Sequence, residues 1–284
     1  MTVARDIFRE TLDTFLDHVD FATLVKADPI VFPRRWPAGP DREVAALTAA
    51  ALSYGRADLI ARALGQLRAR MGADPAAAAM SDSPAQARQR FDGFVYRVTR
   101  GVDLARLWIG CGELLRRHGS LGRAMAAMDR PETPDLRAAI AGFRAEIHRI
   151  TEADFEPRRG FMHLLANPAG QSPLKRWCMF LRWMVRGPDA IDFGDWSALG
   201  THWLTMPLDT HVHRLGLYLG LTARKGADWR TAVEITDGLR ALDAADPLRY
   251  DFALAHMGIS GQCPTRRVPA ICRTCPIQRV CRLP

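Results

Sequence analysis

Apolar residues recur along this chain at spacings of three and four, the period of an amphipathic α-helix. No stretch sustains the apolar–polar alternation of a half-buried strand flanked by turn pairs. Capping residues and prolines divide the periodic runs into short segments. The pattern therefore predicts an all-α protein, a compact bundle of capped helices.

Four aspartates, Asp41, Asp103, Asp209 and Asp228, stand where N-cap residues are expected. Residues 72–90 and 155–171 are expected to be exposed connections, the first with room for a short helix. The expected helices lie at residues 1–27, 42–55, 58–71, 103–118, 120–128 and 134–150, then from Ser172, from Asp209 to Gly220, from Asp228, and from Asp246-Pro247 to Gly258.

The composition is that of a globular chain: 284 residues, 48% hydrophobic and 25% charged, with no apolar run of membrane-spanning length. The first residues carry acids throughout and lack the apolar core of a signal peptide, so we expect a cytoplasmic protein with no membrane partner. The formal net charge is +8, and the sequence pI is about 9.6. This balance favours a polyanionic partner such as nucleic acid, although many unrelated enzymes share it.

The densest chemistry lies between Ser172 and Arg214. Ser172-Pro173 has the form of an N-cap and first helical residue, and Lys175 and Arg182 line up beside the apolar face of the helix that follows. Asp209 precedes a second apolar run. An aspartate there is most often only a cap, and lysines and arginines on a helix are most often a solvated face.

Four of the six cysteines lie in the last 22 residues. This segment has almost no apolar core of its own, so it needs a metal or disulfides to offset its ordering entropy. Without a secretory signal, disulfides are the poorer choice. Four thiolates suit a structural zinc or a 4Fe–4S cluster, and spacing alone leaves these close. The ligands would be Cys263, Cys272, Cys275 and Cys281, spaced C-x8-C-x2-C-x5-C.

The segment Leu208-Asp209-Thr210-His211, followed by Val212 and Arg214, resembles the V-D-T-H-V-x-R segment of the helix-hairpin-helix base-excision DNA glycosylases, the superfamily of endonuclease III. Endonuclease III and the adenine glycosylases also end in C-x6-C-x2-C-x5-C, two residues shorter in the first gap. The resemblance implies that Asp209 is the catalytic carboxylate and that Lys175 attacks the sugar. It also implies that the cysteines hold an iron–sulfur cluster rather than zinc.

The likeness spans most of residues 41–284 and is closest to an uncharacterised bacterial family of the superfamily. It departs from endonuclease III at several points. Tyr54 and Arg56 replace the glutamine of the L-S-x-Q helix end, and the L-P-G-V-G-x-x-T-A hairpin is absent. Lys175 stands 34 residues before Asp209, nearly twice the separation in endonuclease III. The archaeal 8-oxoguanine glycosylases have a comparable separation and a modified hairpin.

Two helical domains with a cleft between them are implied: a helical-barrel-like domain at 41–200, and a second domain from 1–40 with 201–284 that contains the cluster loop 263–281. We expect a monomeric glycosylase that removes a damaged base from double-stranded DNA, with an oxidised purine among the candidates, and that cleaves the strand through a lysine Schiff base. A monofunctional glycosylase in which Asp209 activates water, or a non-catalytic nucleic-acid-binding member, are the alternatives. The residues expected to contact DNA or the base are Arg56, Arg176, Arg182, Trp183, His211, Arg214, Arg266 and Arg267.

Overall fold

The computed structural model describes residues 2–128 and 135–283. Helices make up almost all regular structure in these residues, which confirms the all-α class. The exception is a hairpin of β1 (Val95–Tyr96) and β2 (Thr99–Arg100), paired antiparallel. No helix of the described residues is both long and apolar enough to cross a bilayer.

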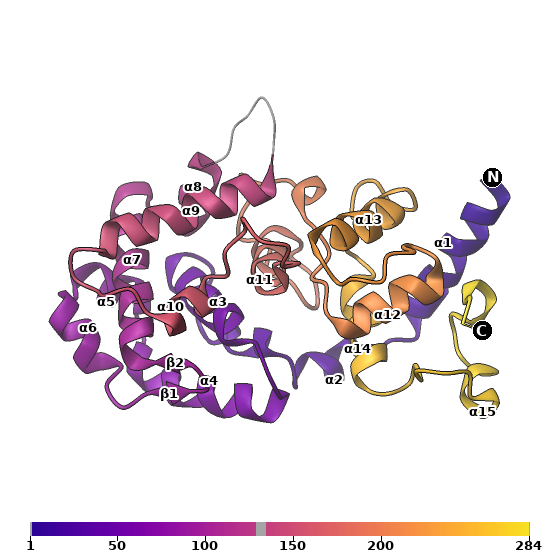
Figure 1. Ribbon diagram of the computed structural model, residues 1–284, viewed down its shortest axis with the longest axis horizontal. Helices are drawn as coiled ribbons and strands as arrows, with labels where there is room; N and C mark the ends of the chain where they lie inside the picture. The colour runs from indigo at the N-terminus through magenta and orange to yellow at the C-terminus, as the bar shows by residue number, and fades with distance from the viewer. Residues whose placement is uncertain (1, 129–134, 284) are drawn as a thin grey trace.

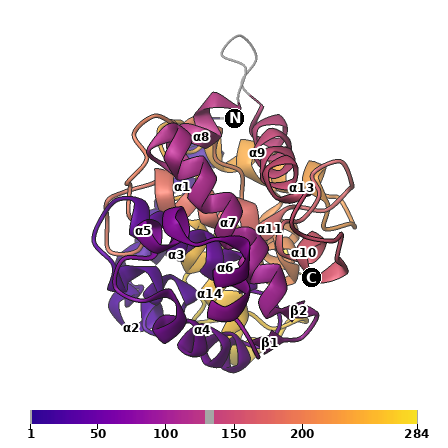
Figure 2. The same ribbon diagram turned by 90° about the vertical axis from the view of Figure 1, so that its left-hand side faces the viewer.

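Eight helices gather at one end of the elongated molecule (Figure 1), and we name them the large lobe. Seen from that end, α7 lies at their centre, with α5, α6, α8 and α9 packed around it (Figure 2). The large lobe consists of α3 (Pro40–Leu52), α4 (Ala57–Met71), α5 (Pro75–Ser81), α6 (Pro84–Arg90), α7 (Gly101–His118), α8 (Leu121–Ala127), α9 (Leu136–Thr151) and α10 (Arg159–Leu164).

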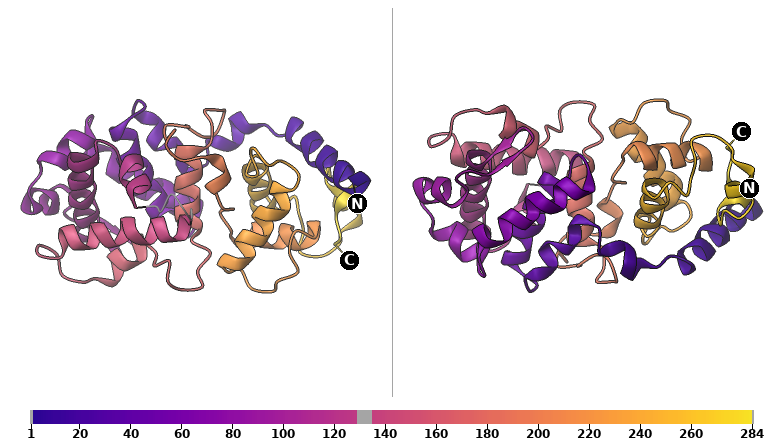
Figure 3. Two further views of the ribbon diagram at one scale, coloured as in Figure 1. Left: turned by 90° about the horizontal axis from the view of Figure 1, so that it is seen from above. Right: turned by 90° about the horizontal axis from the view of Figure 1, so that it is seen from below.

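The other end, the small lobe, joins the first helices of the chain to the last ones. In Figure 3, α1 runs beside the C-terminal segment, and Arg279 there pairs with Glu10 at 3.2 Å. The Tyr250 hydroxyl donates to Asp13 at 2.8 Å, which ties α1 to the segment before α14. The small lobe consists of α1 (Thr2–Asp17), α2 (Phe21–Val25), α12 (Thr210–Leu219), α13 (Trp229–Arg240), α14 (Asp251–Ile259) and α15 (Pro269–Cys272). The domain boundaries expected from the sequence stay a prediction.

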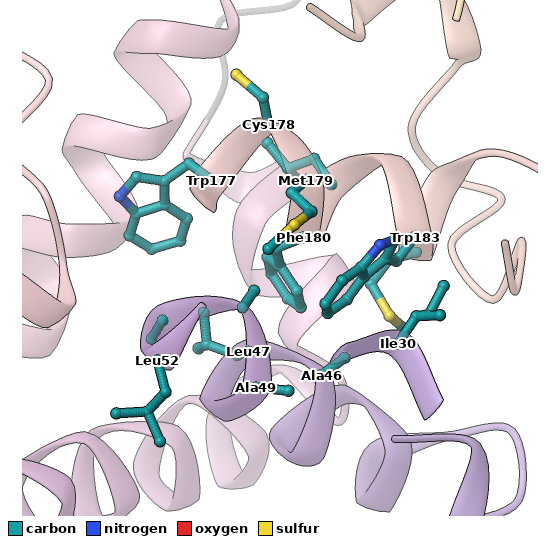
Figure 4. Close-up of a cluster of buried hydrophobic side chains, with 14 of the residues drawn as sticks. Ile30, Ala46, Leu47, Ala49, Leu52, Trp177, Cys178, Met179, Phe180 and Trp183 are labelled. Atoms are coloured by element: carbon teal, nitrogen blue, oxygen red, sulfur yellow. The ribbon is translucent and has the colours of Figure 1, made fainter. Parts of the chain in front are cut away.

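Between the lobes lies α11 (Lys175–Val185), the most deeply buried of the helices that carry expected site residues. It packs against the alanine-rich helix α3, whose small side chains allow the close approach that the sequence suggests. Figure 4 shows the cluster formed at this contact, with Trp177, Phe180 and Trp183 of α11 above Ala46 and Ala49 of α3. Short 3-10 turns complete the structure at Pro29–Val31, Pro33–Arg35, Thr201–Trp203 and Gln278–Val280.

Buried ion pairs attach α11 to the small lobe. Arg182 is buried between Asp192, at 3.2 Å, and Asp251 at the start of α14. Arg186 pairs with Asp192 at 2.9 Å and with Asp246 at 2.9 Å. Guanidinium groups suit such sites because each offers several donors in a fixed plane to several carboxylates. The network fixes the C-terminal end of α11 and the irregular chain after it.

Several expected helix starts are wrong by a few residues. The helix expected at Ser172 begins at Lys175, because Leu174 has a left-handed backbone that interrupts it. Pro40 begins α3 with Gly39 as N-cap, and Asp41 instead accepts from the Ala76 N–H. Asp103 lies inside α7 and accepts from the Arg100 N–H.

Three further differences concern connections. The helix expected from Asp246-Pro247 begins at Asp251 and ends at Ile259. Residues 72–90 contain two short helices, and residues 155–171 contain α10. The expected start of a helix at Pro134 lies outside the described residues, and the helix begins at Leu136. Asp209 and Asp228 do cap α12 and α13 as expected.

Candidate functional site

Lys175 and Asp209 meet in the structure although 34 residues separate them. The Lys175 Nζ atom lies 2.7 Å from Asp209 Oδ2, with the lysine side chain 37% exposed and the aspartate 17%. Both groups therefore reach solvent while being largely enclosed. An amine and a carboxylate in contact at the edge of a pocket can serve in acid–base or nucleophilic chemistry.

Asp209 uses its two carboxylate oxygens for different purposes. Oδ1 accepts hydrogen bonds from the backbone N–H groups of His211 and Val212, both at 2.9 Å, and so caps α12. Oδ2 points to Lys175. Burial would raise the pKa of Asp209, but the Lys175 charge, its hydrogen bond and the Val212 N–H outweigh burial and lower that pKa. The carboxylate is thus held as an anion. The same residue caps α12 and forms part of the candidate site.

Lys175 is placed by an unusual piece of backbone. Leu174, immediately before it, has φ +54°, a left-handed conformation that is costly for a residue other than glycine. Its side chain is buried, and the Leu174 N–H donates to the Ser172 hydroxyl at 3.3 Å. Strain of this kind gathers at functional sites, where the surrounding packing maintains it. Here it sets Lys175 as the first residue of α11.

A pocket with about 50 Å³ of interior space lies beside this pair. Half of its lining residues carry charged or titratable side chains, and the other half are apolar, with the aromatic rings of Trp183 and Phe252 among them. Asp28 and His256 form one polar contact, with Oδ2 and Nε2 3.6 Å apart. The pocket is lined by Asp28, Lys175, Met179, Arg182, Trp183, Pro207, Asp209, Asp251, Phe252, Ala255, His256 and Ile259.

Charge is balanced inside the pocket by Arg182 and Asp251. Burial raises the pKa of Asp251, against the lowering effect of Arg182. Burial acts to lower the pKa of Arg182, but the Asp192 and Asp251 carboxylates outweigh burial and raise it. The nearby Asp209 anion also raises the Asp251 pKa. The pKa of Asp251 in the interior ion pair therefore depends on the charge of the Lys175–Asp209 pair.

Two arginines expected to contact DNA have structural partners instead. The guanidinium of Arg182 lies between Asp192 and Asp251, which leaves no free face for phosphate. Arg176 donates to the backbone carbonyls of Ala51 and His163, and burial lowers its pKa to about 10. Arg182 therefore belongs to a buried ion-pair network, and Arg176 donates to backbone carbonyls; their expected contacts with DNA stay a prediction. Their partners lie far away in sequence, so helical periodicity did not reveal them.

The other expected contacts divide between interior and surface. Trp183 is fully buried in the cluster of Figure 4 and forms part of the pocket lining, so its ring packs in the core. The half-buried His211 packs against Gly258 of α14, and Arg214 donates to the Cys263 carbonyl at 2.9 Å. Arg56 is exposed and pairs with Asp58 at 3.0 Å.

The four C-terminal cysteines all line a second pocket, with about 30 Å³ of interior space. They are free thiols, and burial raises the pKa of Cys263 and of Cys275, with a further contribution from the other cysteines of the group. Among the described residues, no three histidine, cysteine, aspartate or glutamate side chains converge tightly enough for a single metal ion. A loop that turns four thiols towards one space has the donor set of a cluster site.

Backbone contacts hold this cysteine loop to α12. The Arg282 N–H donates to the Tyr218 carbonyl at 2.6 Å, and the Tyr218 hydroxyl donates to the Thr265 carbonyl at 2.9 Å. Arg266 and Arg267 are exposed between the first two cysteines, and Arg267 also donates to the Leu283 carbonyl at 3.3 Å. The other two cysteines, Cys111 and Cys178, are buried in helices as expected, and burial raises the pKa of Cys111 to about 12.

Sequence reasoning missed three polar residues of the Lys175–Asp209 pocket. Asp28 precedes a proline-rich turn, while Asp251 and His256 lie in a mainly apolar helix. None belongs to a local motif. The one available signal was that these charged residues lie within otherwise apolar runs. A charged residue that is buried with such a run needs a partner from elsewhere in the fold.

One comparison with known proteins gave a match. Residues 28–260 match a family model described as a protein of unknown function, DUF2400, and the chain belongs to that family. No curated protein and no solved structure matched the chain. The matched region contains the whole Lys175–Asp209 pocket and stops short of the cysteine loop.

Proposed function

We propose that this member of the DUF2400 family is a base-excision DNA glycosylase with lyase activity, in which Lys175 and Asp209 carry the chemistry. The observation that supports this most strongly is the 2.7 Å contact between Lys175 Nζ and Asp209 Oδ2 at the edge of an enclosed pocket. The resemblance of the Asp209 segment to the helix-hairpin-helix glycosylases supplies the reaction class. The two arguments are independent, since one rests on geometry and the other on sequence.

Asp209 would stabilise positive charge on the substrate. Breaking an N-glycosidic bond leaves positive charge on the sugar, and an anion fixed beside C1′ stabilises that transition state. The low pKa of Asp209 keeps the anion available, and the helix N-terminus that it caps favours negative charge. The base departs with the electron pair of the broken bond and takes up a proton.

Lys175 would act as the nucleophile. The departing base takes up the proton that Lys175 gives up, so Asp209 stays an anion, and the free amine bonds to C1′. The ring oxygen then leaves C1′ and is protonated, which gives a Schiff base. Loss of a C2′ proton expels the 3′ phosphate and cleaves the strand. The approach of substrate replaces water in the pocket and separates the ion pair.

The identity of residue 175 favours chemistry over simple charge. Lys and Arg together number 39, yet the chain contains only three lysines, Lys26, Lys175 and Lys225. An arginine would pair with Asp209 at least as well, because its planar guanidinium matches a carboxylate. Only a primary amine can form a Schiff base. A lysine at the position whose side chain forms an ion pair with Asp209 is therefore what the mechanism requires.

The cysteine loop would hold a 4Fe–4S cluster through Cys263, Cys272, Cys275 and Cys281, with zinc as the alternative occupant. The donor set fits, since the four thiols line one space. When bound, such a cluster supplies the ordering energy that a segment with little core lacks. Arg266 and Arg267 in the same loop would then meet phosphate at fixed positions.

The experiment is a panel of duplexes, each with one damaged base, incubated with and without borohydride. Wild-type protein is compared with Asp209→Asn, Lys175→Ala and Lys175→Arg. We expect one duplex to yield free base, a cleaved strand and a borohydride-trapped adduct. Asp209→Asn should lower the rate about 100- to 1000-fold, the scale for losing one electrostatic group.

Lys175→Arg separates the enzymatic alternatives because it keeps the positive charge and removes the nucleophile. Base release without a trapped adduct, in wild type and variant alike, would identify a monofunctional enzyme in which Asp209 activates water. If no duplex yields product while DNA binding persists, the non-catalytic alternative replaces the proposal.

A further inference from the structure

A groove separate from the Lys175–Asp209 pocket lies between α9 of the large lobe and α13 of the small lobe. The two helices lie on the same side of the molecule (Figures 1 and 2). The groove has about 340 Å³ of interior space, against about 50 Å³ in the Lys175–Asp209 pocket, and no residue lines both. We name it the arginine groove, and its charged and aromatic lining residues are Arg137, Arg224, Asp228, Trp229 and Arg230.

The two lobes are in contact at this groove. The Trp229 N–H, at the start of α13, donates to the Gln171 carbonyl at 3.1 Å. Arg137 of α9 lies over the Trp229 ring, with its guanidinium carbon 5.7 Å from the ring centroid. A cation over the face of an indole is attracted to the electrons of the ring. The half-buried Trp229 ring therefore joins the lobes and also lines the groove.

Arg137 carries a positive charge that no carboxylate balances. Its guanidinium donates to the backbone carbonyls of Pro168 and Gly170. Carbonyl oxygens satisfy these donors but carry no net charge. In residues 2–128 and 135–283, no ion pair joins Arg137 to a carboxylate. Because the side chain is half-buried, an anion in the groove would stabilise its charge.

The small lobe supplies a second unbalanced charge. Arg230 is exposed in the first turn of α13, and its guanidinium forms no ion pair within the described part of the chain. Arg224 differs, because it pairs with Asp228 at 2.9 Å. The groove therefore has two positive charges in excess, one from each lobe.

The excess charge and the aromatic ring together indicate the class of ligand. A phosphate monoester carries a charge of about −1.5 to −2 at pH 7, whereas a phosphodiester carries a single negative charge. Guanidinium groups bind phosphate oxygens through charge-assisted hydrogen bonds. Aromatic side chains offer a flat surface on which any nucleobase can stack.

We propose that the arginine groove binds a nucleoside monophosphate, with the phosphate held by Arg137 and Arg230 and the base against Trp229. The two excess charges match the dianion of a monoester better than the single charge of a diester. The site goes beyond the proposed function and does not depend on it, since the groove and the Lys175–Asp209 pocket share no residue. A ligand held by both lobes would also stabilise their contact.

The test is isothermal titration of the full-length protein with adenosine 5′-monophosphate (AMP), cyclic AMP, adenosine and inorganic phosphate. We expect AMP to bind about tenfold more tightly than cyclic AMP, which keeps the base and sugar but has a diester with one charge. Adenosine lacks the phosphate and should bind more weakly still. Inorganic phosphate lacks the ring, so its affinity should also be about tenfold below that of AMP.

Arg230→Gln is the main variant, because Arg230 is exposed and the fold should tolerate the change. It should weaken AMP binding about tenfold, the scale for losing one charged hydrogen-bond partner. Trp229→Leu should bind inorganic phosphate as wild type does and lose the advantage of AMP over it. Arg240→Gln, on the same helix, is the matched control and should bind AMP normally.

No AMP binding by wild type, or AMP binding that Arg230→Gln leaves unchanged, would overturn the proposal. Equal affinities for AMP and cyclic AMP would overturn it as well, because the match of charge would then have no effect.

A strand of nucleic acid is the other source of a base beside a phosphate. The groove continues along α9 into a space of about 370 Å³ that shares Arg137 and Ala169 with it. A DNA pentanucleotide without a terminal phosphate is therefore the last probe. If it binds more tightly than AMP and Arg230→Gln weakens it, the groove holds a strand and the proposal is wrong. AMP binding in a protein that releases no base from DNA would leave the arginine groove standing and reject the glycosylase.

Discussion

Asp209 shows how one residue serves structure and chemistry together. An N-cap needs a single acceptor oxygen, and Oδ1 fills that role with two backbone N–H groups. The second oxygen remains for Lys175. Because the cap fixes the side-chain torsions, the oxygen that we propose acts in catalysis is held without a further supporting residue. The frequent role of an aspartate before a helix therefore does not compete with the catalytic one.

The lowered pKa of Asp209 predicts its pH dependence. A depressed carboxyl pKa contributes stability that is present above the ordinary value of 3.8 and lost as the pH falls through the folded-state value. The unfolding free-energy difference between wild type and Asp209→Asn should therefore be constant from neutral pH down to about 5 and should shrink progressively as the pH falls further, through 3.8 and below. Urea titrations at a series of pH values measure it. A difference that already shrinks between pH 7 and 5 would contradict the ionised carboxylate.

Single residues were the scale at which sequence reasoning succeeded and failed most clearly. The capping role of Asp209 and the burial of Cys111 and Cys178 followed from local pattern, because each depends on neighbours along the helix. The burial of Arg182 did not, because Asp251 lies 69 residues away. Charged residues on one helical face look alike in sequence whether water or a buried carboxylate faces them.

At the scale of elements, α11 is the helix that the pocket and the interlobe contact share. Sequence pattern located the helix and its apolar face, but placed its start at Ser172, because the left-handed Leu174 is a tertiary requirement and no propensity encodes it. The β1–β2 hairpin was missed for a related reason. Strands of two residues are too short to show any period.

The ion pairs of α11 predict a stability effect that does not depend on catalysis. Arg182→Met would leave the buried Asp251 without its ion-pair partner and Asp192 with Arg186 alone. Losing one partner of a buried pair costs about 3–5 kcal/mol. Urea denaturation followed by circular dichroism measures the change. Arg240→Met, which removes a surface pair with Asp237 on α13, is the control and should change stability by less than about 1 kcal/mol. Equal effects of the two variants would contradict the buried network.

At the scale of the whole molecule, the two ends of the chain lie in contact. Its first helix packs beside its last segment, so the cysteine loop has a support on α1 as well as on α12 (Figure 3). The sequence indicated a loop that needs a metal, but nothing in it showed that residues 1–17 would provide part of its frame. Contacts between the two ends of a chain leave no local pattern.

If the four cysteines hold a cluster, as proposed, loss of one ligand should reduce the order of this end of the molecule. Wild-type protein is expected to be brown and to bind about four iron atoms per chain. Cys275→Ser should lose both the colour and the iron, and hydrogen exchange should increase in residues 263–283 and in α1. Cys178→Ala, a buried thiol of α11, is the control and should keep its iron. Four iron atoms retained by Cys275→Ser would exclude Cys275 as a ligand. One zinc per wild-type chain would replace the cluster with a structural metal.

The cysteine loop at the end of the small lobe presents two exposed arginines, Arg266 and Arg267 (Figure 1). A duplex that places a nucleotide in the Lys175–Asp209 pocket and also reaches this loop would gain phosphate contacts from them. Arg266→Ala with Arg267→Ala should therefore lower the salt slope of DNA binding by about 2. Fluorescence anisotropy over a range of salt concentrations measures this slope. If the double variant keeps the wild-type slope, the cysteine loop does not hold the DNA, and the duplex is bound by the rest of the molecule alone.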